Sequence, residues 1–99
     1  MSFDEKTKQQ VWEMGTVVEN YDRNIWRKDA AQAWIRRNDY GNRDSQYGWE
    51  IDHIHPDSEG GVDELSNLRP LQWKNNVAKQ DGRLKHAVTS SGNQNIDVE

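Results

Sequence analysis

The segment from Trp49 to Asp81 gathers the side chains of this sequence that are best suited to hydrolytic chemistry. Its polar positions combine a carboxylate, an imidazole and several amides: Asp52, His53, Asn67, Asn75 and Asn76. Hydrolysis of a phosphodiester requires a base that deprotonates water and a cation that neutralises the charge building on the phosphoryl oxygens. His53 suits the role of the base, because an unperturbed histidine is mostly neutral at pH 7.

The same segment offers ligands for a metal ion. The carboxylate of Asp52 and the amide oxygen of Asn76 are hard donors, which suit Mg²⁺ first and also Mn²⁺ or another divalent ion. Asn75 competes with Asn76 for this role, and the spacing to Lys79 favours Asn76. The chain has no cysteine, so no Cys-ligated structural zinc is expected.

Neighbouring polar residues leave alternatives open. His55 is either a third metal ligand or substrate contact, or a strand residue that faces solvent. Glu50 is expected to pair with a nearby arginine rather than to bind metal. The acids of the next loop favour a solvated loop over a second metal site: Asp57, Glu59, Asp63 and Glu64.

The elements that must position these residues follow from the pattern along the chain. A strand is predicted from Trp49 to His55, stopped by Pro56, which cannot donate a ladder hydrogen bond. An acidic loop over 57–67 connects it to a second strand over 68–72, and a helix over 73–79 follows. Adjacent side chains of a regular strand point to opposite faces. Asp52 and His53 therefore address one site only if the strand bends or ends near His53.

The rest of the chain is predicted in less detail. Residues 4–14 favour a helix, with acids in its first turn and Gly15 as its stop. Residues 28–37 fit either a helix or the approach to a strand. The tail over 89–99 is rich in small polar residues and is predicted to be disordered. Without disulfides or a zinc site, the five tryptophans are expected to build the core: Trp12, Trp26, Trp34, Trp49 and Trp73.

Taken together, the motifs resemble the HNH endonuclease family of the ββα-metal, or His-Me finger, superfamily. The matching elements cover about a third of the chain: Asp-His-Ile-x-Pro at 52–56, Gly-Gly at 60–61, Ser-Asn-Leu-x-Pro-Leu at 66–71, and Asn-x-x-Lys at 76–79. Many relatives carry histidine at the last motif position and paired CxxC knuckles. Here Asn76 replaces that histidine and the cysteines are missing.

The resemblance implies a fold and a division of roles. It implies a small α+β single domain over 1–88, with a ββα-metal core of hairpin and helix at about 47–82, preceded by an N-terminal helix. It assigns Asp52 and Asn76 to the metal and His53 to activation of water. It also implies that Asn67 is not a ligand, because its amide pins the loop backbone so that His53 faces the scissile phosphate. The products expected by family analogy have 5′-phosphate and 3′-hydroxyl ends.

The charge pattern is compatible with DNA as the partner. The net charge is −4, but residues 23–43 carry +4, residues 44–68 carry −7 and residues 69–86 carry +4. Phosphate contacts depend on local positive potential rather than on the average. Besides His55, four basic residues are predicted to contact DNA: Arg43, Arg69, Lys74 and Lys79.

The leading hypothesis is therefore a metal-dependent DNA endonuclease. The alternatives are a non-catalytic nucleic-acid-binding module on the same scaffold, and a toxin or effector nuclease held by an immunity protein; a role beside DNA-processing partners, as in phage, is also open. No apolar run approaches the roughly 20 residues of a membrane span, and the acidic start is unlike a signal peptide. A cytoplasmic protein without membrane contact is expected.

Overall fold

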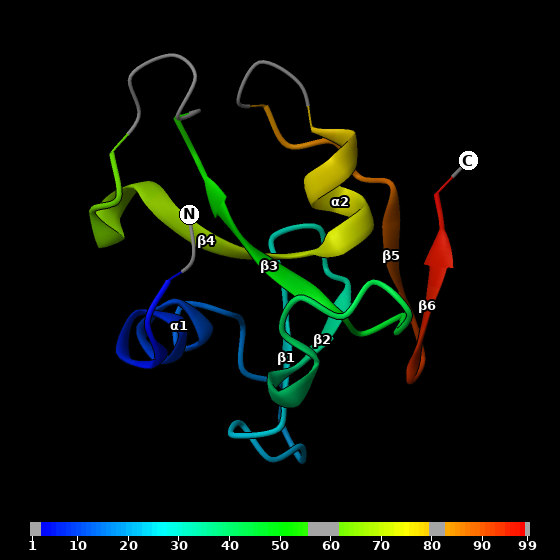
Figure 1. Cartoon of the computed structure of the whole chain (residues 1–99). Coiled ribbons are helices and arrows are strands. Elements are labelled where there is room, and N and C mark those ends of the chain that lie inside the picture. Colours follow the sequence, from blue (N-terminus) through cyan, green and yellow to red (C-terminus); the bar gives the residue numbers. More distant parts are fainter. Residues whose placement is uncertain (1–2, 56–61, 80–82, 99) are drawn as a thin grey trace.

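The computed structural model describes residues 3–55, 62–79 and 83–98 and has an α+β fold (Figure 1). Its elements follow in chain order: α1 Glu5–Trp12, β1 Trp26–Lys28, β2 Trp34–Arg36, η1 Arg37–Asp39, β3 Trp49–His53, η3 Leu65–Asn67, β4 Leu68–Gln72, α2 Trp73–Ala78, β5 Val88–Ser91 and β6 Gln94–Asp97. Within the described residues the strands form three antiparallel pairs, β1–β2, β3–β4 and β5–β6. The mixed α+β class predicted from the sequence is confirmed.

The N-terminal helix α1 is short and capped by its own sequence. The backbone N–H of Thr7 donates to Oδ1 of Asp4 at 2.8 Å, which satisfies one of the free donors at the start of the helix. Val11 and Trp12 in the last turn are fully buried. Gly15 ends the segment in a crowded place, since a Cβ there would lie 3.2 Å from the Trp12 carbonyl oxygen and from the Arg27 side chain.

Two strands and a helix follow one another over 49–78, and this order positions the candidate site. β3 and β4 pair in register across all five residues, from Trp49 opposite Gln72 to His53 opposite Leu68. α2 begins directly after β4. Gln72 caps it, because its Oε1 accepts the N–H of Lys74 at 2.7 Å. Figure 1 shows α2 lying alongside the β3–β4 pair.

The segment over 28–37, which the sequence left open, forms strands rather than a helix. Asp29 explains the turn between β1 and β2: its Oδ1 accepts the N–H groups of Ala31 and Ala33, each at 2.9 Å. Its Oδ2 accepts the N–H of Gln72 at 2.9 Å. A buried carboxylate with several donors thus joins the β1–β2 turn to the start of α2.

The prediction of a disordered tail over 89–99 is wrong for the part that the structure describes. Val88–Ser91 and Gln94–Asp97 pair as a hairpin around Gly92, which has a φ of 61°. Asn95 fastens this hairpin to β2: its Oδ1 accepts the N–H of Trp34 at 2.7 Å and its Nδ2 donates to the Trp34 carbonyl at 2.9 Å. Low hydrophobicity suggested disorder, but a side-chain amide supplies the order. The domain limit at residue 88 stays a prediction.

Aromatic residues build much of the core, as the sequence predicted. Trp12 and Trp49 are fully buried with ring centroids 5.4 Å apart, and they pack among aliphatic residues of α1, β2, β3 and β4. Trp34 is buried in a second aromatic group, whereas Trp26 and Trp73 are only half-buried. Among the described residues, no helix has the length and apolar character required to cross a membrane.

Candidate active site

Strand β3 presents its side chains alternately to two faces. Glu50 and Asp52 point toward α2, where they meet Asn76 and Lys79. His53 contacts other partners: its ring lies 6.0 Å from that of Phe3, centroid to centroid. The regular pairing with β4 continues to His53, and the strand ends there. Asp52 and His53 are therefore the last two residues of the strand. The strand ends at His53, and its pairing with β4 is unbroken up to that residue. Pro56, expected to stop the strand, lies outside the described residues.

Asp52 is a buried carboxylate held by two cations. Its side chain is 2% exposed. Arg69, directly opposite on β4, donates from Nε to Asp52 Oδ2 at 2.8 Å, and Lys79 forms an ion pair with Oδ1. Removing a carboxylate from water costs several kcal/mol unless charges and hydrogen bonds compensate for the loss. The two cations provide that compensation in this arrangement.

Arg69 and Lys79 thus point inward rather than along the surface. Lys79 also donates to the backbone carbonyl of His53, which ties the C-terminal end of α2 to the end of β3. Nη2 of Arg69 is buried and has no hydrogen-bond partner. Of the four basic residues predicted to contact phosphate, these two are committed to Asp52. Lys74 and Arg43 also have acidic partners, Asp97 and Glu50, but their side chains are 47% and 56% exposed.

Glu50 forms a second polar cluster next to Asp52 on the same face. Arg43 donates two hydrogen bonds to its carboxylate, at 2.7 and 2.9 Å, and Nδ2 of Asn76 donates a third at 2.8 Å. Burial raises the pKa of Glu50, but the bonds from Arg43 and Asn76 and the charge of Arg43 outweigh it, so the pKa lies below its ordinary value. The expectation that Glu50 pairs with an arginine is confirmed. Its contact with Asn76 was not predicted, although the two-residue spacing from Asp52 places both on one face.

His53 forms a pair with an acid that sequence reasoning did not assign to the site. Nε2 of His53 lies 2.5 Å from Oδ1 of Asp63, and its side chain is 21% exposed. Asp63 belongs to the loop that was interpreted as solvated. A carboxylate on one ring nitrogen fixes the orientation and tautomer of an imidazole, which leaves the other nitrogen to accept a proton. Only the path of the loop brings Asp63 to His53, so no spacing rule pointed to it. Asp57 and Glu59 lie outside the described residues.

Asn67 ties the two ends of the loop between β3 and β4 together. Its Oδ1 accepts the N–H of His55 at 2.7 Å, and its Nδ2 donates to the carbonyls of His55 at 3.1 Å and Val62 at 2.8 Å. Its own carbonyl accepts the N–H of Ile54 at 2.8 Å. These bonds fix the backbone just beyond His53. The side chain of His55 itself is exposed. The motif glycines, Gly60 and Gly61, lie outside the described residues.

The two asparagines of α2 have different environments. Asn75 is fully buried, and both ends of its amide bond to neighbours: Nδ2 donates to Asp29 Oδ2 and to the Val88 carbonyl, and Oδ1 accepts the N–H groups of Ala87 and Val88. Asn76 is half-buried and faces Glu50. Asn75 therefore has a structural function, and of the two amides Asn76 is the one that faces the polar cluster.

The donor types on this face fit a hard divalent cation. Asp52, Asn76 and Glu50 offer carboxylate and amide oxygens, which are the ligands that Mg²⁺ and Mn²⁺ prefer. The described residues contain no cluster of three or more histidine, cysteine or acidic side chains. The site thus offers suitable oxygens but not a pre-assembled cage, and Asp52 would have to exchange part of its contact with Lys79 or Arg69 for the ion.

Comparison with known proteins places this site in context. Residues 38–82 match a family model described as HNH endonuclease. That range includes β3, β4 and α2 together with all the residues of the candidate site. No curated protein and no solved structure matched the chain.

Proposed function

We propose that the chain is a metal-dependent endonuclease that hydrolyses phosphodiester bonds of DNA, on the basis that residues 38–82 match the model of the HNH endonuclease family. The observation that best supports the proposal is the arrangement at the end of β3. There the loop held by Asn67 places Asp63 beside His53. The preceding residue, Asp52, contributes a carboxylate to the side of the strand that faces α2. The β3, β4 and α2 elements would then be the ββα-metal core.

His53 is proposed to activate the attacking water. With Nε2–H donating to Asp63, the free nitrogen Nδ1 takes a proton from water as the water attacks phosphorus. Asp63 would then stabilise the imidazolium, in the way that a buried acid supports histidine in hydrolase triads. Asn67 has no direct part in this step and positions the loop backbone beside His53. The bond from phosphorus to the 3′ oxygen then breaks and that oxygen takes a proton from solvent water, which gives 5′-phosphate and 3′-hydroxyl ends.

Asp52 and Asn76 are proposed to hold the divalent ion, with Mg²⁺ preferred and Mn²⁺ as a substitute. A bound ion would neutralise charge on the phosphoryl and leaving oxygens. Glu50 lies beside Asn76 and orients its amide through the bond from Nδ2, which leaves Oδ1 as the donor oxygen. Lys74 and Arg43, the exposed basic residues near α2, are proposed to contact the DNA backbone without reading its sequence. His55 is exposed just beyond the end of β3 and is proposed as a further substrate contact.

Plasmid nicking tests the assignment of the base. Supercoiled DNA is incubated with Mg²⁺ or Mn²⁺ and with wild type, His53→Ala or the matched control His86→Ala, which removes an exposed histidine outside the site. General-base catalysis contributes roughly 10²- to 10⁴-fold, so His53→Ala is expected to lose at least 100-fold in rate while His86→Ala keeps wild-type activity. Equal nicking by wild type and His53→Ala would refute the role of His53.

Metal titration tests the ligands separately from activity. Calorimetry with Mn²⁺ should show binding by wild type and none by the double variant of Asp52→Ala and Asn76→Ala, while Asp97→Ala, at the exposed edge of β6, retains it. Circular dichroism checks that each variant is folded. Ion binding that survives in a folded double variant would remove the proposed metal site.

One observation favours a second candidate function. Asp52 is already paired with Lys79 and Arg69, an arrangement that suits a non-catalytic DNA-binding module on the same scaffold. Such a module would bind DNA with an affinity that falls as salt rises, and it would cut in no divalent ion. Metal-dependent nicking that His53→Ala abolishes excludes this candidate. A partner protein, such as an immunity protein, stays a proposal that toxicity on expression would test.

A further inference from the structure

An aromatic pocket lies outside the candidate active site. It has a volume of about 160 Å³ and is lined by Tyr21, Trp26, Trp34, Tyr47 and Asn93. A closed cavity of about 150 Å³ is known to hold one benzene ring, so the space suits one planar ring system. Four of the five lining residues are aromatic, and they come from the loop before β1, from β1 and β2, and from the approach to β3.

The rings enclose the pocket from several directions. Tyr21 and Trp34 have centroids 4.7 Å apart and are tilted by 51°. Trp26 meets Trp34 at 80° and Tyr47 at 89°, with centroid distances of 6.0 and 4.8 Å. In edge-to-face contacts of this kind the edge of one ring rests on the face of the other, so the rings that line the pocket support one another.

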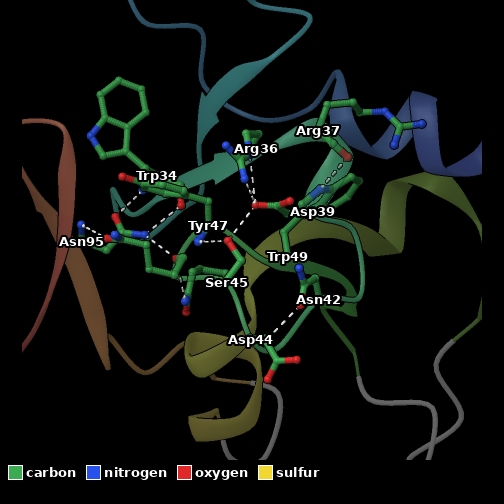
Figure 2. Close-up of polar contacts among 12 residues, drawn as sticks. Trp34, Arg36, Arg37, Asp39, Asn42, Asp44, Ser45, Tyr47, Trp49 and Asn95 are labelled. Carbon is green, nitrogen blue, oxygen red and sulfur yellow. Dashed lines mark hydrogen bonds and ion pairs between the residues drawn. The ribbon is translucent and has the colours of Figure 1, made fainter.

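The wall formed by Tyr47 is held by a polar chain behind it, as Figure 2 shows. The N–H of Tyr47 donates to Oγ of Ser45 at 3.0 Å, and that hydroxyl donates to Oδ2 of Asp39 at 2.6 Å. Nε of Arg36 donates to the same carboxylate oxygen at 3.0 Å. Asn95 fixes the backbone of Trp34 on the other side. The pocket is therefore built from residues whose positions are fixed before a ligand arrives.

Two of these rings already use their polar groups within the chain. The hydroxyl of Tyr47 donates to the Asn93 carbonyl at 2.9 Å, and Nε1 of Trp34 donates to the Gly92 carbonyl at 2.7 Å. What the pocket offers is mainly π surface with few free donors. This chemistry favours stacking, which tolerates any base, over recognition by hydrogen bonds.

Two cations lie close to the same rings. The guanidinium carbon of Arg36 is 5.6 Å from the Trp26 ring and 5.7 Å from the Tyr47 ring, and Nζ of Lys28 is 4.7 Å from the Trp34 ring. The charge of Arg36 is paired with Asp39, so Lys28 supplies the charge that disfavours a cationic ligand such as a methylated amine. A positive charge at this place favours a flat neutral ring that carries a phosphate.

From these contacts we infer that the aromatic pocket binds one unpaired nucleobase of DNA, with a flanking phosphate toward Lys28. The inference deepens the proposed function and rests on it, since DNA is the substrate in both. A base stacked in a duplex cannot enter such a pocket, so the ligand is a bulged, flipped or single-stranded nucleotide. Tyr21, which is 43% exposed, forms the outer wall.

The distance to the candidate active site gives the inference a second consequence. Tyr47 and His53 are six residues apart, and β3 occupies most of that interval. At about 3.4 Å per residue of extended chain the separation is at most about 20 Å, because Tyr47 itself lies in a turn before β3. This limit corresponds to about six nucleotides at ~3.4 Å per nucleotide of one strand. An unpaired base held in the pocket would therefore direct cleavage to a position within about six nucleotides.

Binding of defined oligonucleotides tests the pocket without cleavage. Fluorescence anisotropy is measured in chelator with His53→Ala protein and two labelled duplexes, one fully paired and one with a single extra adenine. Stacking of one base is worth about 1–3 kcal/mol, which is a 5- to 150-fold preference for the bulged duplex. Adding Tyr21→Ala should remove the preference, and adding Tyr21→Phe should keep it. Ile25→Ala is the matched control, because Ile25 is a similarly exposed apolar residue outside the pocket.

Equal affinity for the two duplexes would overturn the inference, and so would a preference that survives Tyr21→Ala. The outcome is separable from that of the proposed function. A protein that prefers the bulged duplex but never nicks supports the pocket and refutes the nuclease. A protein that nicks DNA but shows no preference for the bulged duplex supports the nuclease and refutes the pocket. Nicks made by wild type on the bulged duplex are then mapped, and they are expected within about six nucleotides of the extra adenine.

Discussion

Substitution of the two adjacent asparagines of α2 should separate stability from activity. Asn75→Ala removes four hydrogen bonds, two donated by Nδ2 and two accepted by Oδ1, of which three are buried and one is partly buried. At about 1 kcal/mol for each bond, the expected loss is about 3–4 kcal/mol. The total stability of a chain of this length is about 5–15 kcal/mol. Asn75→Ala should therefore lower Tm by at least about 12 °C, or prevent folding altogether.

Asn76→Ala removes one hydrogen bond, the 2.8 Å contact from Nδ2 to Glu50, and Glu50 keeps both bonds from Arg43. The expected loss of stability is about 1 kcal/mol. Nicking should nevertheless fall toward the level seen without divalent ion, because the amide oxygen proposed for the metal is lost. Urea unfolding, followed by tryptophan fluorescence, and nicking at a temperature where the variant is folded measure the two effects. If Asn76→Ala lost more stability than Asn75→Ala, the assignment of roles would be refuted.

Two further predictions concern Asn67 and Glu50. Asn67→Ala removes three hydrogen bonds at the partly exposed loop and should lower stability by about 1–3 kcal/mol in thermal melts. The folded variant should also lose nicking activity. Full activity at unchanged Tm would contradict the positioning role of Asn67. The pKa of Glu50 lies below its ordinary value of 4.5 in the fold, so its carboxylate stabilises the protein above that value and this contribution is lost as pH falls through the lowered pKa. Glu50→Gln should thus be less stable than wild type at neutral pH and lose less on acidification; parallel curves of Tm against pH for the two proteins would disprove it.

The elements of the candidate site were predictable because their signals are local. The strand over 68–72 was predicted with the limits that the structure shows, and the helix over 73–79 differs from α2 by one residue. A proline, a run of strand-forming residues or a run of helix-forming residues each indicates the backbone structure of the few positions around it. The hairpin over 88–97 was missed for the opposite reason. Its order depends on Asn95 and Trp34, whose contact spans 61 positions and leaves no periodic signal.

The same distinction applies inside the site. The alternation of side chains along a strand indicates that Glu50 and Asp52 share a face. Because α2 packs on this face, its side chains supply partners for both acids. Asp63 could not be assigned in this way, because an irregular loop decides where it lies. The sequence also showed Arg69 and Lys79 as positive charges without showing their direction. A basic residue beside a buried acid pairs with that acid before it serves a substrate.

The spacing between Asn76 and Lys79 has a physical explanation in the contact between α2 and β3. Residues three apart lie on one face of a helix, and residues two apart lie on one face of a strand. Asn76 can therefore reach Glu50 while Lys79 reaches Asp52. Asp52 is nearly fully buried, and leaving it without a cation would cost several kcal/mol. Lys79 and Arg69 allow the fold to form without a bound ion, and any divalent ion at Asp52 must compete with them. The metal affinity of this site should accordingly depend on these two cations as much as on the ligands themselves.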